Sequence, residues 1–294
     1  MNPSRTAVVC DSGCDIGRRC AAAFGITIID LIVNYKSRSV KDLDLLEEDP
    51  LYVYKHFDEE IPKTSALNIH DVVTVCEGLL EQGFQNFITV SISSAMSSTY
   101  NTMVCAMNEL MEAHPDVKTF AFDTRNISIG AGAFAIWAGD RLNHDGASFE
   151  EVSSRLPEKL HDSDLEFYMD TLKYLRIGGR ITPAVETVSN ILGIRPIIKC
   201  NDEGRYITVS KVRGSRKAVD RLVDNILDPA KNIDPEHDWF MLMNGDGVEL
   251  AAAARARILE RYPKADILLD HQIVPTMAIN TGPGLLGICR FSKQ

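Results

Sequence analysis

The sequence predicts an α/β protein in two parts: an N-terminal domain over residues 1–160, with a parallel sheet covered by helices on both faces, and a C-terminal α+β domain over residues 161–294. Three observations support this division. The length of 294 residues exceeds the usual size of one hydrophobic core. Strand-like and helix-like patterns alternate through the first half, which is typical of a parallel sheet. In the second half, the turn Asn201-Asp202-Glu203-Gly204 joins two strand-like runs as a hairpin.

The elements of the first half follow from hydrophobic periodicity and end signals. The expected strands are Thr6–Cys10, Ile26–Val33, Phe87–Val90 and Val117–Phe122. The expected helices are Gly17–Phe24, one beginning near Glu47 with Pro50 in its first turn, one capped by Asn68 and ended by Gly83, one carrying Met103 to Met111, and a polar one near Ser148 to His161. Residues 36–44 read as a ribbon or loop.

The second half mixes strands and helices with less regular alternation. The expected strands are Leu165–Met169, Arg195–Cys200, Tyr206–Val209, Trp239–Met243, Asp266–Leu269 and Leu286–Phe291. The expected helices start at Leu172 and Pro183 and cover Ser215–Leu227 and Val248–Tyr262.

Composition excludes several classes of protein. The formal net charge of −10 argues against a nucleic-acid or anionic-membrane partner, because such partners require a basic surface. The seven cysteines are odd in number and form no C-x-x-C pair, so we expect no disulfide framework, no metal site and a reducing cytoplasm. No apolar run approaches the ~18 residues of a membrane span, and the N-terminus lacks a signal-peptide pattern.

Common nucleotide and hydrolase motifs are absent or misplaced, so no cofactor is expected. Gly282 to Gly287 matches G-x-G-x-x-G, but only seven residues follow it, too few for the helix and strand that a dinucleotide site requires. Gly130-Ala131-Gly132 indicates close helix packing instead. Neither G-x-x-x-x-G-K-[ST] nor G-x-S-x-G occurs.

A hydroxyl-rich segment, Ile92–Tyr100, lies where a strand gives way to a helix. Free N–H groups at a helix N-terminus favour an anion, and Ser or Thr hydroxyls can donate to the same oxygens. Because the segment holds no Lys, Arg or His, it suits the carboxylate of an otherwise apolar molecule better than a phosphate. Capping of the following helix by Ser97 or Ser98 is the structural alternative.

Other polar residues follow strands or precede helices at the same predicted edge of the sheet. Asp11, Ser12 and Asp15 follow the first strand and suggest either a metal or phosphoryl site or, more simply, an N-cap and first-turn charge for the next helix. Thr64-Ser65 precede the helix capped by Asn68, and Asp123-Thr124 follow a strand. In parallel sheets the ligand site lies at the carboxyl ends of the strands.

Eight motifs in order resemble those of the DegV family. They are Val9–Asp15, Thr64-Ser65, Ile92–Tyr100, Phe122–Thr124 with Ile127–Gly130, Asp170–Ile181, Arg195–Ile197, Lys211–Gly214 and Thr281–Gly284. The resemblance implies a DegV-type fold and a non-catalytic subunit of a bacterial fatty acid kinase. Such a subunit binds a long-chain fatty acid, with the tail at and beyond the domain interface, and presents its carboxylate to a partner kinase that supplies ATP.

The family pattern places six residues around the ligand carboxylate: Thr64, Ser65, Ser93, Ser94, Asn280 and Thr281. Two departures bear on this site. Both glycines of the family's serine loop are replaced, by Ala95 and Ser98, so the loop backbone is open to change. Asn280 stands where the family usually has a histidine, and asparagine cannot become cationic near pH 7. We therefore expect either weaker binding of the carboxylate head group or a ligand that differs from a plain fatty acid.

Basic residues in the middle of the chain form a candidate docking face for the kinase, although solvated charge beside Asp220 and Asp224 is the alternative. They are Arg176, Arg180, Lys211, Arg213, Arg216 and Lys217. A different class of function also stays open: a stand-alone hydrolase or phosphotransferase acting on a small carboxylic acid through the Ser93 loop. The sequence pairs no histidine with that loop.

Overall fold

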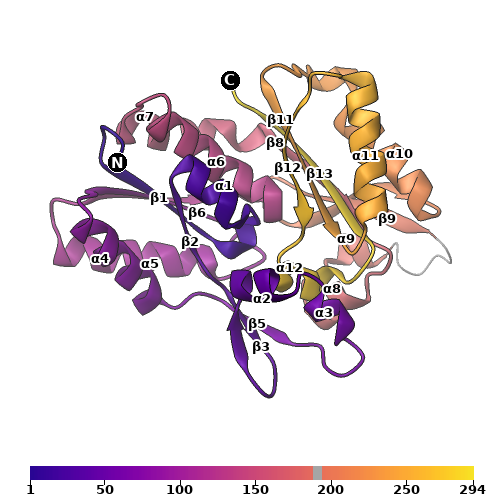
Figure 1. The fold of residues 1–294 in the computed structure, drawn as a ribbon, viewed down its shortest axis with the longest axis horizontal. Helices are drawn as coiled ribbons and strands as arrows, with labels where there is room; N and C mark the ends of the chain where they lie inside the picture. Colours follow the sequence, from indigo (N-terminus) through magenta and orange to yellow (C-terminus); the bar gives the residue numbers. More distant parts are fainter. Residues whose placement is uncertain (188–193) are drawn as a thin grey trace.

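The computed structural model describes residues 1–187 and 194–294, which form three sheets with helices on and between them (Figure 1). The first sheet is parallel and has the order β2-β1-β6-β7. Its strands are β1 (Thr6–Asp11), β2 (Ile26–Ile29), β6 (Asn86–Ser91) and β7 (Lys118–Asp123). The predicted parallel sheet is therefore present.

Alternate residues of β1 supply the two buried faces of this sheet. Ala7 and Val9 pack against α4 (Ile69–Glu81) and α5 (Thr99–Ala113). Val8 and Cys10 face the opposite way, into the core that contains α1 (Gly17–Phe24) and α6 (Ser128–Asn143). The period of two explains why the strand reads as a continuous apolar run.

The second sheet is mixed, with the order β10-β9-β8-β13-β11-β12, and only its β11–β12 pair is parallel. Its strands are β8 (Ser163–Tyr168), β9 (Arg195–Cys200), β10 (Tyr206–Val212), β11 (Asp238–Gly245), β12 (Asp266–Gln272) and β13 (Leu285–Ser292). Helices α10 (Ser215–Ile226) and α11 (Val248–Arg261) share a core with one face (Figure 1).

Helix α6 lies between the two large sheets and is buried nearly all round. Its residues share one hydrophobic cluster with strands of both sheets, including Val90, Leu165 and Phe291. Two glycines allow the backbones to approach: a Cβ at Gly132 would lie 2.2 Å from the carbonyl oxygen of Cys14, and one at Gly139 would lie 2.5 Å from that of Phe24. The small residues of α6 thus serve close packing, as the sequence indicated.

A small antiparallel sheet, β4-β3-β5, projects from the parallel sheet (Figure 1). It consists of β3 (Ile32–Asn34), β4 (Ser39–Lys41) and β5 (Lys63–Ser65). The single strand predicted over Ile26–Val33 is wrong, because the chain bends at Asp30 and Leu31 to enter this sheet. The bend is held where the N–H of Leu31 donates to the Ser12 hydroxyl and the N–H of Leu43 donates to Asp30.

Two helical segments differ from the prediction. Pro50 lies between α2 (Asp42–Glu48) and α3 (Tyr52–Lys55), not in the first turn of one helix, since the preceding Asp49 is extended. Helix α12 (Pro275–Thr281) was not anticipated, although Pro275 at its start and Gly282 just past its end, with φ of 72°, are helix end signals.

Short elements complete the fold. They are α7 (Phe149–Arg155), a 3₁₀ turn (Leu156–His161), α8 (Lys173–Ile177), α9 (Pro183–Glu186), and 3₁₀ turns at Ser12–Cys14 and Pro229–Lys231. The parallel sheet comes from before residue 160 and the mixed sheet from after it, but they share a core, so the domain boundary stays a prediction. No helix within residues 1–187 and 194–294 combines the length and apolar character that crossing a membrane requires.

Candidate functional site

An inner cavity of about 100 Å³ lies between the two large sheets, at the carboxyl ends of β6 and β7. Its apolar lining is rich in methionine, isoleucine and leucine. Its lining residues are Leu31, Thr64, Ser65, Ala66, Ile92, Met96, Ser97, Ser98, Ile127, Ser128, Phe167, Arg180, Tyr206, Met243, Ile273, Thr276, Met277, Asn280, Thr281 and Leu285. This location is where open α/β sheets bind ligands.

Four of the six residues predicted around a carboxylate line the inner cavity. Thr64 and Ser65 reach it from β5, and Asn280 and Thr281 reach it from the end of α12. The small projecting sheet and the unanticipated helix therefore meet at the cavity. Thr64 and Asn280 are 216 positions apart in the sequence, and only the fold brings them together.

Ser93 and Ser94 do not line the inner cavity, and their place at a ligand carboxylate stays a prediction. The buried Ser93 hydroxyl donates to the carbonyl oxygen of Gly204 at 2.9 Å, while Ser94 is exposed and its N–H donates to Asp123 at 3.2 Å. The loop turns immediately after Ser93, whose carbonyl accepts from the N–H groups of Met96 and Ser97. That turn places Ser97 and Ser98 on the cavity instead.

Some lining hydroxyls already donate their hydrogen bond to another group of the protein. Ser128 donates to Asp15 at 2.5 Å, Thr276 to Asp42 at 2.6 Å and Thr281 to the Met277 carbonyl at 3.1 Å. One N–H of the Asn280 amide donates to the Thr276 carbonyl at 3.0 Å. These hydroxyls offer a ligand only oxygen lone pairs, so they do not suit a carboxylate.

Other lining hydroxyls have no protein acceptor and can donate a hydrogen bond to a ligand. Those of Thr64, Ser98 and Tyr206 have no partner within residues 1–187 and 194–294. Ser65 accepts from the Asn34 amide at 2.7 Å, which leaves its own proton to donate. These hydroxyl donors are neutral, and most of them come from segments other than the serine loop.

Arg180 is the only charged residue among the described residues that line the inner cavity. Its guanidinium donates to the Gly178 carbonyl at 2.5 Å, and other N–H groups of the same fork stay available. The sequence placed Arg180 in a docking face, and no pattern predicted that it reaches the cavity. Among the other lining residues that the prediction missed, Ser97 and Ser98 follow from the loop's turn and Ser128 lies in one of the eight motifs, whereas Tyr206 carried no signal in the sequence.

A second hollow, the outer cavity, adjoins the inner one, and its lining includes the exposed residues Lys63, Ile177 and Arg180. It has a volume of about 290 Å³ and is lined by Ile61, Pro62, Lys63, Thr64, Ile177, Gly178, Arg180, Ile279 and Asn280. Thr64, Arg180 and Asn280 line both cavities and so mark their junction. An amphiphile with its tail in the inner cavity would place its polar end at this junction.

Two buried carboxyl groups hold helix α12 against the N-terminal half. Asp42 accepts from the N–H of Thr276 at 2.8 Å and from the Ser12 hydroxyl at 2.7 Å, and Asp15 accepts from the N–H of Val274 at 3.1 Å. Burial raises the pKa of Asp15 and of Asp42 to about 7, although these hydrogen bonds oppose the shift. These hydrogen bonds from Val274 and Thr276 fix the position of α12, the helix that carries Asn280.

The roles predicted for Asp11, Ser12 and Asp15 are corrected by these contacts. The residue before α1 is Ile16, and no side chain caps that helix. Asp11 is buried and accepts from the N–H of Ile92 at 3.2 Å, and burial raises the pKa of its carboxyl to about 7. Through these contacts Asp11, Ser12 and Asp15 connect segments that lie far apart in the sequence. No group of three or more His, Cys, Asp or Glu side chains in the described chain is placed to hold a metal ion.

The remaining basic residues of the predicted docking face line neither cavity. Arg176 forms an ion pair with Glu186 at 3.2 Å, and Lys211 and Arg213 are exposed at the end of β10. Arg216 and Lys217 lie in the first turn of α10. Asp220 and Asp224, the expected partners in the alternative reading, form ion pairs with Arg257 and Arg261 of α11.

Comparisons with known proteins give concordant results. A family model described as "Uncharacterised protein, DegV family" matches residues 5–293. A DegV domain-containing protein of Clostridium acetobutylicum is 29% identical over 289 residues, covering 98% of this chain and 99% of the relative. A DegV family protein from Thermus thermophilus, described in terms of fatty acid binding, has a TM-score of 0.86 at 23% identity, covering 99% and 100% of the two chains. A DegV lipid-binding protein from Thermotoga maritima has a TM-score of 0.80 at 25% identity, covering 98% of each.

Proposed function

Because the chain belongs to the DegV family, we propose that it binds one long-chain fatty acid and presents the carboxylate to a partner kinase that forms an acyl phosphate. The observation that carries the proposal is the junction between an apolar inner cavity and a basic outer cavity, where unpaired donors gather. The solved structures of similar fold that are described as fatty-acid-binding or lipid-binding proteins support the ligand class.

The tail of the acid supplies most of the binding energy. Burying about fifteen methylene groups yields on the order of 12 kcal/mol before association costs. The inner cavity is smaller than the roughly 300 Å³ of typical ligand pockets. Met96, Met243 and Met277 line it, and methionine side chains are flexible enough to move aside for a tail.

In this proposal Thr64 and Arg180 hold the carboxylate at the junction, and Ser65 and Ser98 add hydroxyl donors from the lining of the inner cavity. Three of these residues contribute hydroxyl protons, and Arg180 contributes positive charge. Charge-assisted hydrogen bonds are shorter and stronger than neutral ones. The hydroxyls therefore orient the carboxylate, while Arg180 offsets part of the cost of removing it from water.

The chemical step requires little from this chain beyond positioning. A carboxylate oxygen attacks the γ-phosphorus of the ATP that the kinase holds, the bond from phosphorus to the β,γ-bridging oxygen breaks, and ADP leaves. Precise placement of the attacking oxygen and neutralisation of charge are the main contributions to such a transfer. In this proposal the chain is a substrate-presenting subunit and is not itself a catalyst.

The kinase docks over the outer cavity, where the carboxylate is reached from solvent. Lys63 and Arg180 line that opening. Lys211 and Arg213 are exposed and remain candidates for contact with the kinase. The seven cysteines are all free, which suits a reducing cytoplasm.

The enzyme alternative finds little support in the site. The Ser93 hydroxyl proton is committed to the Gly204 carbonyl, and no histidine within the described ranges hydrogen-bonds to the serines of that loop. His271 is partly buried, with 23% of its side chain exposed; removal from water lowers its pKa to about 4, and its Nε2 lies 3.9 Å from Asp15. Because Asp15 lies between His271 and Ser128, the order differs from that of a serine nucleophile activated by histidine.

Titration with palmitate and transfer of phosphate from ATP test the two halves of the proposal separately. Saturable binding of palmitate by wild type, weakened in Thr64→Val, supports the ligand. Formation of acyl phosphate only when both a fatty acid kinase and this chain are present supports the partner. Acyl phosphate formed by this chain alone would establish the enzyme alternative.

A further inference from the structure

Tyr206, the first residue of β10, lines the inner cavity, and its hydroxyl has no hydrogen-bond partner in the described part of the chain. The residue is only 6% exposed, and its ring packs edge to face on Phe167 with the ring centroids 5.5 Å apart. Burial raises the pKa of the hydroxyl, so it keeps its proton at neutral pH. A buried tyrosine hydroxyl usually has a partner, and the proposed binding of the carboxylate does not supply one.

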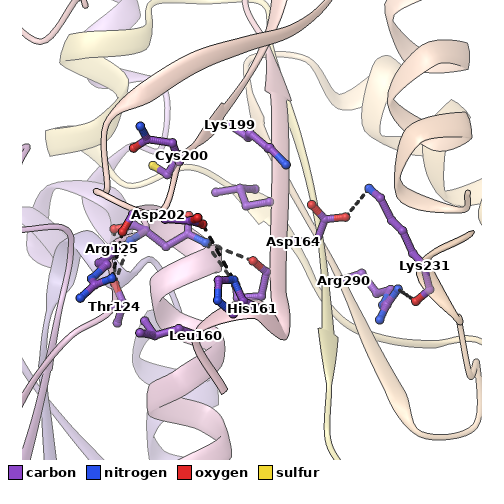
Figure 2. Close-up of a pocket in the computed structure, with 14 residues that line it drawn as sticks. Thr124, Arg125, Leu160, His161, Asp164, Lys199, Cys200, Asp202, Lys231 and Arg290 are labelled. Carbon is purple, nitrogen blue, oxygen red and sulfur yellow. Dashed lines mark hydrogen bonds and ion pairs between the residues drawn. The ribbon is translucent and has the colours of Figure 1, made fainter. Parts of the chain in front are cut away.

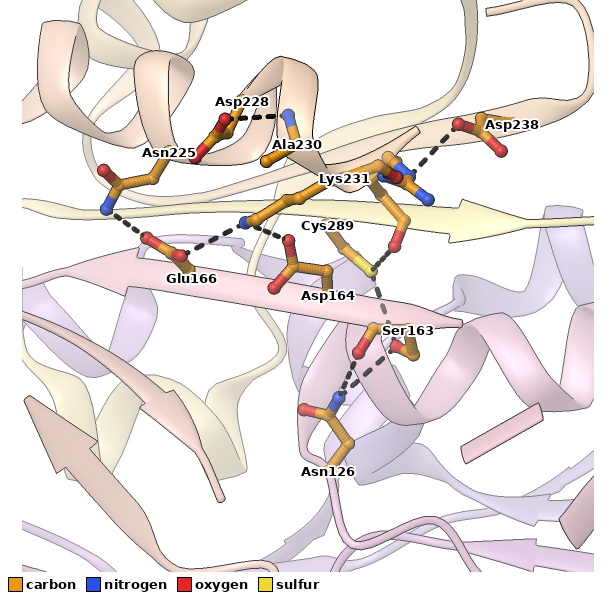
Figure 3. Close-up of polar contacts among 11 residues, drawn as sticks. Asn126, Ser163, Asp164, Glu166, Asn225, Asp228, Ala230, Lys231, Asp238 and Cys289 are labelled. Atoms are coloured by element: carbon orange, nitrogen blue, oxygen red, sulfur yellow. Dashed lines mark hydrogen bonds and ion pairs between the residues drawn. The ribbon is translucent and has the colours of Figure 1, made fainter. Parts of the chain in front are cut away.

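The polar cavity drawn in Figure 2 differs from the inner cavity, because the protein itself compensates its charges. It has a volume of about 330 Å³ and lies where the loop after β7 meets β8 and β9. Figure 3 shows the Lys231 ammonium between a carboxylate oxygen of Asp164, at 2.5 Å, and one of Glu166, at 3.6 Å. Lys199 lies opposite Glu166 in the β8–β9 pair. In the inner cavity, by contrast, the Tyr206 hydroxyl is left without such compensation.

Two other hydroxyls line the inner cavity as acceptors only. Ser128 donates its proton to Asp15 at 2.5 Å, and Thr276 donates its proton to Asp42 at 2.6 Å. The lone pairs that remain on these oxygens need a donor, which an ionised carboxylate does not have. The lining thus contains one buried donor and two acceptors that a plain fatty acid leaves unused.

A second polar group on the ligand would belong to its chain and not to its carboxylate. Tyr206, Ser128 and Thr276 line the inner cavity and not the outer one, whereas the proposed position of the carboxylate is the junction of the two. Half of the described residues that line the inner cavity have polar side chains. The lining therefore suits an acid that carries a further polar group along its chain.

We propose that the ligand is a hydroxy fatty acid whose chain hydroxyl accepts a hydrogen bond from Tyr206. A hydroxyl is both an acceptor and a donor, so it suits the donor of Tyr206 and the acceptor oxygens of the same lining, whereas a keto group would only accept. The inference rests on the proposed binding of a fatty acid and specifies the class of that acid. It agrees with Asn280, whose departure from the family pattern already indicated a ligand that differs from a plain fatty acid.

Titration with a set of hydroxystearates, with stearate as the reference, tests the inference. The set carries the hydroxyl near the carboxylate, in mid-chain or at the end of the tail. Binding is measured at about pH 8.5, where the carboxyl groups of Asp15 and Asp42, with pKa values of about 7, are ionised and keep their donors. Wild type should bind at least one hydroxystearate about 3-fold to 10-fold more tightly than stearate, the range for one additional neutral hydrogen bond.

Tyr206→Phe removes only the hydroxyl and should abolish this preference. Its affinity for stearate should equal or exceed that of wild type, because no buried donor is then left unpaired. Tyr262→Phe is the matched control and should keep the preference, since Tyr262 packs in the core shared with α10 and α11 and lines neither cavity. Thermal unfolding without ligand checks that both variants fold.

Two outcomes would overturn the inference and leave the binding of a fatty acid intact. In the first, stearate binds saturably and no hydroxystearate binds more tightly. In the second, Tyr206→Phe weakens the binding of stearate and of the preferred hydroxystearate equally, which would assign Tyr206 to the carboxylate. If neither stearate nor any hydroxystearate binds to wild type, the proposed function itself fails, and the inference fails with it.

Discussion

The hydroxyl of Ser93 donates to the carbonyl oxygen of Gly204, which lies 111 residues further along the chain. The contact is tight, because a Cβ at position 204 would lie only 2.1 Å from the Ser93 oxygen. This hydrogen bond joins the loop after β6 to the β9–β10 hairpin and so connects the N-terminal and C-terminal halves of the chain. Ser93, which the sequence predicts at the ligand carboxylate, is thus a link between distant segments in this structure.

Ser93→Ala should therefore reduce stability more than fatty acid affinity. Losing one buried hydrogen bond costs about 0.5–1.5 kcal/mol, and more when the carbonyl is left unpaired. Urea unfolding should show this loss, while palmitate titration should change little. A large loss of affinity at unchanged stability would return Ser93 to the head-group site.

Thr64→Val and Ser98→Ala should reduce fatty acid affinity more than stability. Each removes a hydroxyl that has no protein partner in the described chain and that lines the inner cavity. Losing one hydrogen bond to a carboxylate costs about 1.5–3 kcal/mol of binding, whereas folding stability should stay near that of wild type. Ser94→Ala is the matched control, because Ser94 is exposed outside the cavity. Affinity unchanged in both variants would place the carboxylate elsewhere.

Arg180→Gln should weaken the binding of palmitate more than the binding of the uncharged alcohol of equal length. The guanidinium is the only charge lining the described inner cavity, so its removal acts on the carboxylate and not on the tail. Arg176→Gln serves as the control, since Arg176 lies outside both cavities and pairs with Glu186. Equal losses for the acid and the alcohol would show that Arg180 only shapes the entrance.

Asp42→Asn should flatten the dependence of stability on pH. The folded-state pKa of Asp42 is raised from 3.8 to about 7, so the folded protein binds the proton more tightly than the unfolded chain. Stability contributed by this group is present at low pH and is lost as pH rises through the window from about 4 to 7. The amide cannot ionise, and its stability should lack this part of the loss. Melting temperatures between about pH 5 and 7.5 measure it.

Exposed Asp116→Asn provides the control for that series and should follow the wild-type curve. Asp11 and Asp15 are buried beside the same segments with pKa values raised to about 7, so some pH dependence should remain in Asp42→Asn. A variant curve parallel to that of wild type would mean that Asp42 does not contribute to the titration.

Asn280→His should introduce pH dependence into fatty acid binding. Asn280 lies at the junction of the cavities and cannot titrate, so wild-type affinity should change less than that of the variant between about pH 5.5 and 7.5. A histidine beside a bound carboxylate has a raised pKa, and proton uptake on binding strengthens binding as pH falls. Titration of both proteins with a fluorescent fatty acid measures this difference. Parallel curves would show that position 280 does not contact the head group.

The sequence predicted those parts of the fold that depend on local patterns. The alternation of Ala7 and Val9 with Val8 and Cys10 specifies a strand buried on both faces, and Asn68 caps α4 through a bond to the N–H of Asp71, three residues away. Such signals lie within one turn of a helix or within one strand, so periodicity and end signals are enough to detect them.

The parts that were missed depend on contacts between distant segments. The bend after Ile29 requires Ser12, and the orientation of Ser93 requires Gly204. Helix α12 is short and is held through its N–H groups by Asp15 and Asp42, which lie more than 230 positions earlier. No pattern within a window of the sequence contains these pairs. For the same reason Arg180 was assigned to a surface and not to the cavity.

Extraction of the purified protein shows whether it carries a bound fatty acid. Protein made in a bacterial host is denatured in organic solvent, and the released lipids are identified and quantified by mass spectrometry against the amount of chain. We expect close to one equivalent of a fatty acid of roughly fourteen to eighteen carbons, in line with the burial estimate for the tail. Protein that releases no fatty acid and also fails to bind added palmitate would contradict this expectation.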